Sequence, residues 1–258
     1  MHYQKITYKQ ASEKYKDLMD LIPSSELYSA SEEGQDVNIA VFDGDIELDE
    51  IDNDCSNYFI DLPDSGICCI IVRGNLSVKK YINLRHSDVG IAPHLLVTGN
   101  LKADAVFING GGFLYVGEDL KLARYLFIDD GAFLAVTCKG SVSCDFAFIE
   151  GQSDYSFNVL KQGIFYIHDY TPDYPYNQIN KIENKAKVIR VLNEQDVYFI
   201  EVQGITSKLV DADSFDKLHK IYAIFEDYEN SLESELIFES YKNGNNLFRL
   251  MEFDNILK

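Results

Sequence analysis

The chain has 258 residues and a hydrophobic fraction of 46%, which supplies a core for one large or two modest domains. Its 42 acidic residues outnumber 23 basic ones and give a formal net charge of −19. Because affinity for nucleic acids rests on lysine and arginine, this balance argues against a nucleic-acid partner and favours a basic one.

The first twenty residues, "MHYQKITYKQASEKYKDLMD", lack a basic stretch followed by an apolar one. No window of the chain approaches the roughly 18 apolar residues that a membrane span needs. We therefore expect a cytoplasmic protein without membrane contact. The five cysteines show no CxxC spacing, which favours buried thiols over a disulfide framework or a zinc ribbon. They are Cys55, Cys68, Cys69, Cys138 and Cys144.

A short helical pattern occupies the N-terminal region. Ala11, Tyr15, Leu18 and Ile22 fall on one stripe, and Pro23 ends the pattern. We therefore predict that residues 1–40 form an N-terminal helical cap.

The middle of the chain repeats a phrase of the form "x-Gly-polar-apolar" or close to it: "DGDI", "RGNL", "TGNL", "GEDL" and "KGSV". Other columns share a period near twenty, among them Phe107, Phe127 and Phe148, with an isoleucine after each. That period suits one coil of a β-solenoid built from three short strands and three turns. Residues 41–168 are therefore predicted to form a single-stranded β-helix.

Equivalent residues of successive coils lie about 4.8 Å apart, so each repeated column becomes a ladder of like side chains. The phenylalanine and isoleucine columns are adjacent, and the period alone leaves open which of them points inward. Core packing explains both without any function.

The segments "VTGNLKADAVFI" and "IVRGNLSVKKYI" resemble the coils of bacterial polymer-forming proteins of the bactofilin type and of related solitary right-handed β-helix proteins. The likeness covers about Val41 to Gly151. It implies right-handed coils and, as one alternative, self-assembly into filaments. The chain departs from that pattern in the insertion "RHSDVGIAPH" and in its non-repeating flanks.

The insertion contains three residues of metal-ligating types, His86, Asp88 and His94. Their spacing matches no zinc signature, and a loop that bulges from the solenoid accounts for them equally well. A second set, Cys138, Cys144 and His168, lies on strand-like segments where small buried side chains are usual. We expect no cofactor.

Acidic residues on the coils raise the alternative of a carbohydrate-active enzyme, because some right-handed β-helix proteins are polysaccharide lyases or hydrolases. Such catalysis needs carboxylates at a defined separation or a basic partner beside one of them. Abundant carboxylates in so acidic a chain are more simply solvated turn residues, so we expect no enzyme. The candidates are Asp104, Asp129, Asp130, Asp145 and Glu150, with Lys121 and Arg124 as basic partners.

The segment "HDYTPDYPY" combines aromatic, acidic and proline residues in the manner of a rigid contact surface. An equally good interpretation is an edge cover laid across the last coil. The candidate partner-binding residues are Asp169, Tyr170, Asp173, Tyr174 and Tyr176.

Residues 169–258 are predicted to form a C-terminal α/β capping element. Its strand-like runs are "KVIRVL" and "VYFIEVQ", and a helix begins at Asp213 or Ser214. The tail around "NGNN" fits a hairpin or a helix followed by a strand. Caps cover the open strand edges of a solenoid, so the flanks favour a discrete particle over a filament.

Our leading hypothesis is therefore a non-enzymatic protein, a monomer or small homo-oligomer, that binds a protein partner through a rigid acidic and aromatic surface. Immunity-type neutralisation of a basic partner such as a toxin is one form of it. The alternatives are bactofilin-like self-assembly and a carbohydrate-active enzyme on the coil face.

Overall fold

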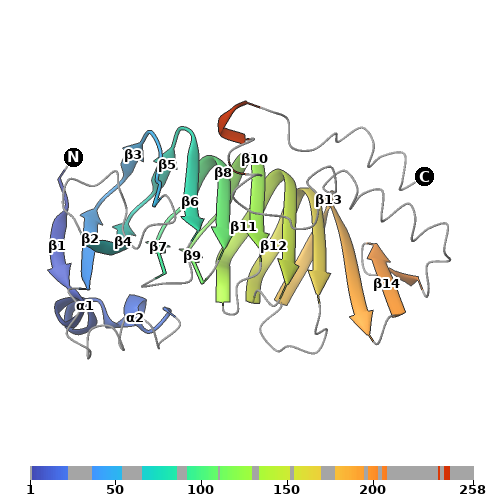
Figure 1. Cartoon of the computed structure of the whole chain (residues 1–258), viewed down its shortest axis with the longest axis horizontal. Coiled ribbons are helices and arrows are strands. Elements are labelled where there is room, and N and C mark those ends of the chain that lie inside the picture. The colour runs from blue at the N-terminus through green and yellow to red at the C-terminus, as the bar shows by residue number, and fades with distance from the viewer. Residues whose placement is uncertain are drawn as a thin grey trace.

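The computed structural model is mainly β and contains a β-solenoid (Figure 1). The residues that it describes are 2–22, 37–53, 66–85, 92–109, 111–129, 134–151, 154–169, 178–194, 197–202, 205–207, 238 and 241–244.

The N-terminal segment folds as β1 (Gln4–Thr7), α1 (Tyr8–Lys14) and α2 (Lys16–Met19). Thr7 caps α1, because its side chain accepts a hydrogen bond from the Gln10 N–H while the Gln10 side chain accepts one from the Thr7 N–H. The strand β1 then pairs antiparallel with the first strand of the solenoid.

The solenoid has three faces, each formed by parallel strands. We call them A, B and C in the order in which each coil passes through them. Face A contains β2 (Asn38–Asp43), β4 (Ile67–Arg73), β7 (His94–Val97), β9 (Phe113–Val116) and the first parts of β11 (Leu134–Gly151), β12 (Asp154–Asp169) and β13 (Gln178–Glu194). Face B contains β3 (Ile46–Leu48), β5 (Leu76–Val78), the first parts of β8 (Leu101–Asn109) and β10 (Leu120–Asp129) and the middle parts of β11, β12 and β13. Face C contains β6 (Tyr81–Arg85) and the last parts of β8, β10, β11, β12 and β13.

The predicted coil length of about twenty residues is confirmed by the register of face C. Phe107 stacks on Phe127, then Phe148, Tyr166 and Ile189, so successive steps are 20, 21, 18 and 23 residues and make about four turns. The turns before Phe107 are longer, since Ile51 pairs with Ile82 and Ile82 with Val106.

The added length lies at one corner. The segments that separate face C from the next face A strand include residues 54–65 and 86–91, whereas only residues 110–112 separate β8 from β9. Between faces A and B the turns stay short, as in residues 44–45 between β2 and β3. The coils therefore differ in length at the corner from face C to face A.

The interior of the solenoid is a continuous, mainly aliphatic core that also contains the rings of Phe42, Tyr155, Phe157 and Phe165. On face C the residues that point inward are the aliphatic column next to the phenylalanines, such as Ile108, Ile128 and Ile149. Phe107, Phe127 and Phe148 consequently point outward, which answers the question that the period left open.

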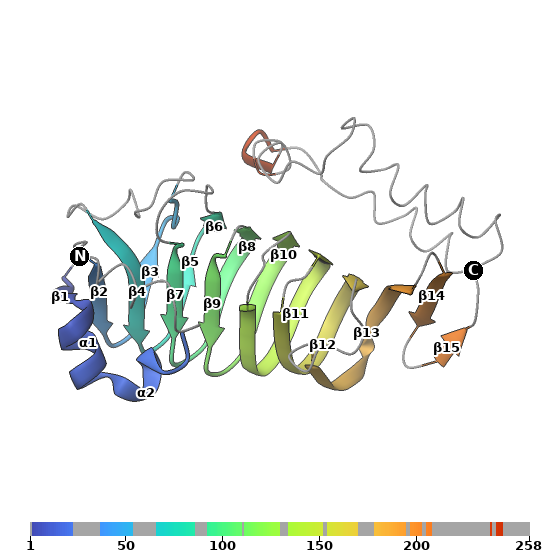
Figure 2. The same ribbon diagram turned by 60° about the horizontal axis from the view of Figure 1, so that its bottom comes forward.

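The parallel stack continues through β13, beyond residue 168, and then turns back. The strands β14 (Val197–Val202) and β15 (Ile205–Ser207) extend it antiparallel (Figure 2). Of the two strand-like runs of the sequence, "KVIRVL" lies in β13 and "VYFIEVQ" forms β14, whereas β15 was not predicted. The helix predicted to begin at Asp213 or Ser214 lies outside the described residues. Phe238, Tyr241 and Lys242 are helical.

Candidate functional site: the exposed face and its acidic first rung

The outer surface of the first four strands of face A is covered by the N-terminal helices. The outward-pointing Ile39, Ile71 and Leu96 share one buried cluster with Ala11 and Met19. In Figure 2, α1 and α2 lie along this side of the first strands. Tyr15 and Ile22, two further members of the predicted helical stripe, belong to the same cluster, and Leu18 packs against it. This part of face A is therefore occupied by the chain itself, whereas the later strands carry the polar outward residues Thr137, Ser156 and Gln178.

The outer surface of face C carries an aromatic row, which consists of Phe107, Phe127, Phe148 and Tyr166. The last three rings stack, with centroids 5.2 and 5.5 Å apart and nearly parallel planes. All four side chains are buried although they point away from the core.

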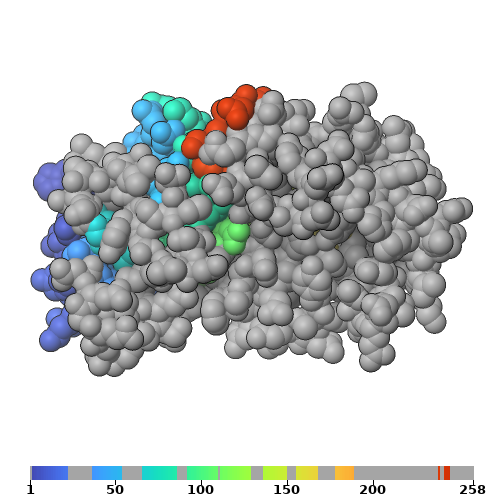
Figure 3. All heavy atoms as spheres, in the orientation of Figure 1, coloured from blue at the N-terminus to red at the C-terminus, as the bar shows by residue number. Residues whose placement is uncertain are grey.

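Part of the cover on this row comes from the C-terminal helical residues. The Phe107 centroid lies 5.1 Å from that of Phe238 and 5.1 Å from that of Tyr241, and both of these side chains are buried. Figure 3 shows the red C-terminal residues seated against the earlier coils.

A polar cluster fixes this contact. Nε of Arg124 donates to Oδ2 of Asp104 at 2.8 Å, and the Tyr241 hydroxyl donates to the same oxygen at 2.5 Å. The Asp104 carboxylate raises the pKa of Arg124 further, and burial raises the pKa of Tyr241, so both groups remain donors. Two of the candidate enzyme residues, Asp104 and Arg124, are thus brought together, but as an anchor for Tyr241.

Buried polar groups of the first coils adjoin this cluster. Asp52 accepts hydrogen bonds from the Tyr81 hydroxyl at 3.0 Å and from Nδ2 of Asn83 at 2.6 Å. Nε of Arg85 donates to Oδ1 of Asn83 at 3.0 Å, and the Arg85 guanidinium lies 4.3 Å from the Phe238 centroid. These contacts stabilise the region under the C-terminal element.

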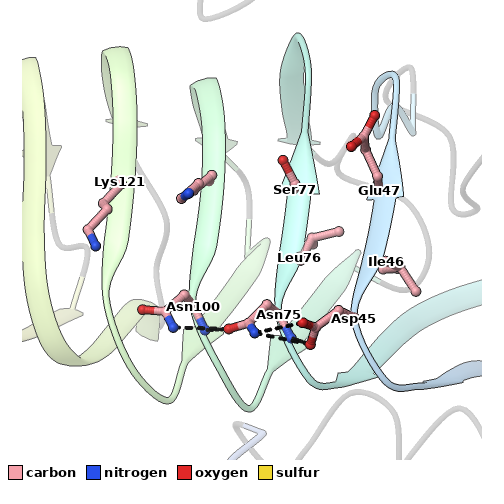
Figure 4. A pocket seen from close by; sticks show the side chains of 9 residues that line it. Asp45, Ile46, Glu47, Asn75, Leu76, Ser77, Asn100 and Lys121 are labelled. Carbon is pink, nitrogen blue, oxygen red and sulfur yellow. Dashed lines mark hydrogen bonds between the residues drawn. The ribbon is translucent and has the colours of Figure 1, made fainter.

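Face B presents a polar outer surface from its first coil onward, in contrast to face C and to the first four strands of face A. Its outward row runs from Glu47 through Ser77, Lys102 and Lys121 to Ser143, and the two lysines are exposed. Figure 4 shows the open groove along this row, which the first four of these residues help to line.

A ladder of amide and carboxylate side chains forms one border of the groove (Figure 4). Asp45 accepts from the Asn75 N–H at 2.8 Å, Oδ1 of Asn75 accepts from the Asn100 N–H at 2.8 Å, and Oδ1 of Asn100 accepts from the Asp119 N–H at 3.2 Å. Asp119 in turn accepts from the Ser141 N–H at 2.9 Å. These five residues occupy the polar position of the repeated phrase, so the repeat encodes the ladder.

The carboxylates of the ladder are held as anions. The Ser141 N–H is the main cause that lowers the pKa of Asp119 to about 2. The hydrogen bond from the Asn75 N–H likewise lowers the pKa of Asp45. Such groups act as structural acceptors rather than as acids or bases near neutral pH.

The first coil of face B is strongly acidic. We call the five carboxylates from the end of β2 to the turn after β3 the acidic rung: Asp43, Asp45, Glu47, Asp49 and Glu50. Three cations of the second coil face it, with Arg73 2.7 Å from Asp43, Lys79 2.9 Å from Asp49 and Lys80 2.8 Å from Glu50. Within the described part of the chain, five carboxylates against three cations leave two negative charges in excess. The side chains of Asp43, Glu47 and Asp49 are 63%, 64% and 72% exposed.

The other predicted enzyme residues are dispersed. Lys121 lies on face B and pairs with Asp119 at 3.1 Å, whereas Asp145 is exposed on a later coil. The side chains of Asp129 and Glu150, and the whole of Asp130, lie outside the described part of the structure.

The predicted metal ligands are not brought together by any described contact. His94 lies buried in β7, where its Nδ1 is 2.5 Å from the Ala92 carbonyl oxygen. His86 and Asp88 lie outside the described residues. Within the described ranges no three His, Cys, Asp or Glu side chains form a group that would hold a metal ion.

The four described cysteines are buried free thiols. Burial raises the pKa of Cys68 to about 12 and of Cys138 to about 11, so both are protonated and unreactive at neutral pH. The predicted set of Cys138, Cys144 and His168 gains no support, and the His168 side chain lies outside the described part.

The predicted partner-binding loop is not covered by the structure. The backbone of Asp169 ends β12 and pairs with Leu192, but its side chain is not among those described. Tyr170, Asp173, Tyr174 and Tyr176 lie outside the described residues. The acidic rung was not singled out from the sequence, although the alternating segment "DGDIELDE" carries its signal.

No helix in the described part of the chain combines the length and apolar character needed to cross a membrane. No family model, curated protein or solved structure matches the chain. Fold and site together define a β-solenoid whose face B is polar and exposed.

Proposed function

We propose that this protein is a non-enzymatic binding protein whose acidic rung holds a basic protein partner. The observation that carries the proposal is the first coil, in which the five carboxylates of the acidic rung face three cations among the described residues. Fixed surface charge of this kind steers and orients an oppositely charged partner. Neutralisation of a basic toxin is one form of this function.

Two physical features support a binding role over a catalytic one. The pKa values of Asp45, Asp49 and Asp119 are lowered, which suits permanent anions and not proton donors. Asp104 and Arg124, the best-placed acid and base on the coils, are engaged with Tyr241. A carbohydrate-active site therefore lacks a supporting observation in the described residues.

The proposal is tested by selecting a phage-displayed random peptide library on the purified protein. We expect enrichment of peptides rich in lysine and arginine that bind less tightly as salt is raised. The same peptides should fail to bind the variant Asp45→Asn/Glu47→Gln/Asp49→Asn. A matched control is Glu13→Gln/Asp20→Asn/Asp145→Asn, which removes three exposed carboxylates elsewhere. Enrichment without basic bias, or equal binding to both variants, would contradict the proposal.

Self-assembly is a second candidate because the last coil of face B carries exposed Lys181 and Lys185, opposite in charge to the acidic rung. Two observations weigh against a coaxial stack. The edge of β2 is already paired with β1, and the last part of β13 is already paired with β14. Light scattering on a sizing column at low and high salt separates the two: a mass that grows with concentration supports assembly, and a constant mass of one or two chains supports the discrete particle.

We also propose the finer features of the architecture. The coils are right-handed, as the resemblance to bactofilin-like β-helix proteins implies. The flanks act as caps, which the pairing of β1 with β2 supports at the N-terminal end. The protein is proposed to act in the cytoplasm, without a nucleic-acid or membrane partner.

A further inference from the structure

The strand β3 forms an edge of the sheet. Within the described residues it pairs only with β5 and ends the strand order of the sheet. Ile46 donates its N–H to the Asn75 carbonyl at 2.9 Å, and the Leu48 carbonyl accepts from the Lys79 N–H at 3.0 Å. Both residues therefore direct their backbone groups toward the second coil.

The backbone of Glu47 points the other way. In a parallel pair, alternate residues of a strand direct their N–H and C=O groups to opposite edges. Since Ile46 and Leu48 face β5, the N–H and C=O of Glu47 face away from the stack. They offer one donor and one acceptor to an additional strand.

The side chains of residues 45–49, which are β3 and one residue on either side of it, alternate between two environments. Asp45, Glu47 and Asp49 are exposed, whereas Leu48 is buried in the core and Ile46 is partly buried against it. Successive carboxylates therefore recur every two residues, about 6.7 Å apart along the strand. The apolar positions between them lie at the end of the solenoid core.

We propose that β3 binds an extended segment of a partner protein by strand addition, and that this segment alternates basic with apolar residues. Backbone hydrogen bonds to Glu47 hold the segment, and its lysine or arginine side chains lie opposite Asp45, Glu47 and Asp49. The apolar residues between them cover Ile46 and Leu48. This inference rests on the proposed function and specifies how the basic partner is recognised.

The charges of the second coil leave a place for a cation of the partner at the open edge of β3. Lys79 is shared by Glu47, at 3.3 Å, and Asp49, at 2.9 Å. Asp45 is hydrogen-bonded by the neutral Asn75. One cation thus serves two carboxylates, and an added strand supplies the missing charge from the open side.

Charged residues on an edge strand also prevent edge-to-edge aggregation, and that role requires no partner. The two roles differ in what they require of a ligand. If the carboxylates only prevent aggregation, binding of a basic peptide should not depend on the order of its residues. Strand addition, in contrast, requires a peptide with alternating residues and free backbone N–H groups.

The test uses three capped heptapeptides and the full-length protein in isothermal titration at low salt. The first alternates lysine with valine, the second has the same composition in two blocks, and the third is the alternating peptide with methylated backbone nitrogens. We expect the second and third to bind at least about tenfold more weakly than the first, which corresponds to about 1.4 kcal/mol.

Variants locate the binding at the edge. Glu47→Pro removes the outward N–H and leaves the bonds of Ile46 and Leu48 to the second coil, since proline is tolerated at a strand edge. It should abolish the preference for the alternating peptide, while Glu47→Gln weakens all three peptides and Glu13→Gln changes none. Circular dichroism confirms that each variant is folded.

The outcomes separate the inference from the proposed function. Equal binding of all three peptides, lost in Asp45→Asn/Glu47→Gln/Asp49→Asn, overturns strand addition and leaves the acidic binding function standing. Absence of binding by every peptide overturns both. A dimer that the alternating peptide dissociates identifies a second copy as the occupant, which also overturns the inference.

Discussion

Tyr241 donates its hydroxyl hydrogen to Oδ2 of Asp104, a residue 137 positions earlier in the chain. The same oxygen accepts hydrogen bonds from Arg124, whose guanidinium carbon lies 4.6 Å from the Tyr241 centroid. One carboxylate at the corner between faces B and C therefore fixes a C-terminal residue to the middle of the solenoid.

Replacement of Tyr241 should separate the hydrogen bond from the ring contacts. Tyr241→Phe keeps the ring on Phe107 but leaves Asp104 with one donor fewer, and we expect a loss of about 1–2 kcal/mol in the free energy of unfolding. Tyr241→Ala also removes a buried ring and should cost about 3–5 kcal/mol. Urea denaturation measures both. An unchanged midpoint for Tyr241→Ala would show that this residue does not pack on face C in solution.

The amide ladder makes a second prediction. Asn100 donates to Asn75 and to Oε2 of Glu118, and it accepts from the Asp119 N–H. Asn100→Asp removes the donor and places a third carboxylate beside Glu118 and Asp119. We expect a loss of about 1–3 kcal/mol that shrinks when salt is added. Lys102→Ala, an exposed change in the same coil, is the control, and an equal loss there would contradict the role of the ladder.

Two glycines with positive φ should respond differently to alanine. A Cβ atom on Gly163 would lie 2.1 Å from the Cys144 carbonyl oxygen of the adjacent coil, whereas one on Gly44 would meet nothing within 4 Å. Gly44→Ala therefore costs only the strain of its backbone, about 1 kcal/mol. Gly163→Ala must also separate two coils, and we expect a loss well above 2 kcal/mol. Melting temperatures of the two variants show which substitution destabilises the protein more. A larger loss for Gly44→Ala than for Gly163→Ala would contradict the prediction.

Stability should depend on Asp119 in acid. Its pKa falls from the ordinary 3.8 to about 2 in the folded protein, mainly because the Ser141 N–H donates to the carboxylate. The stabilisation is therefore complete above pH 4 and is lost as the pH falls toward 2. We expect Asp119→Asn to be less stable than the parent by about 1 kcal/mol at neutral pH. Urea titrations from pH 7 to pH 2 should show this difference narrowing, and a difference that widens in acid would refute the assignment.

The buried thiols should resist alkylation. Burial raises the pKa of Cys68 to about 12 and also raises that of Cys69 and Cys144, so little thiolate forms at pH 8. Iodoacetamide should leave these residues unmodified in the native protein and label them in urea. Peptide mass spectrometry gives the result residue by residue, and labelling of Cys69 at the rate of a free thiol would contradict its burial.

The repeat made the solenoid predictable because the same columns recur in every coil. The polar position of "TGNL" and "RGNL" is where Asn100 and Asn75 meet, and the coil length follows from the spacing of Phe107 and Phe127. Local sequence carries this information since each coil contacts mainly its neighbours.

Other features depend on contacts that no local pattern records. Phe107 points outward and is nevertheless buried, because residues such as Phe238 lie over it. The period could not reveal this, since it is the same for the phenylalanine and the isoleucine columns. The alternating carboxylates around Glu47 are visible in the sequence. That β3 is an edge strand follows only from the order of the strands.

The uneven corner between faces C and A has a consequence for the length of the molecule. Since extra residues are taken up at that corner, the spacing between coils stays near 4.8 Å whatever the length of the individual coil. The number of coils therefore determines the length of the solenoid. Adding or deleting one coil would change the distance between the acidic rung and the β14–β15 hairpin by one coil spacing. The number of coils thus sets the distance between any partners bound at the two ends.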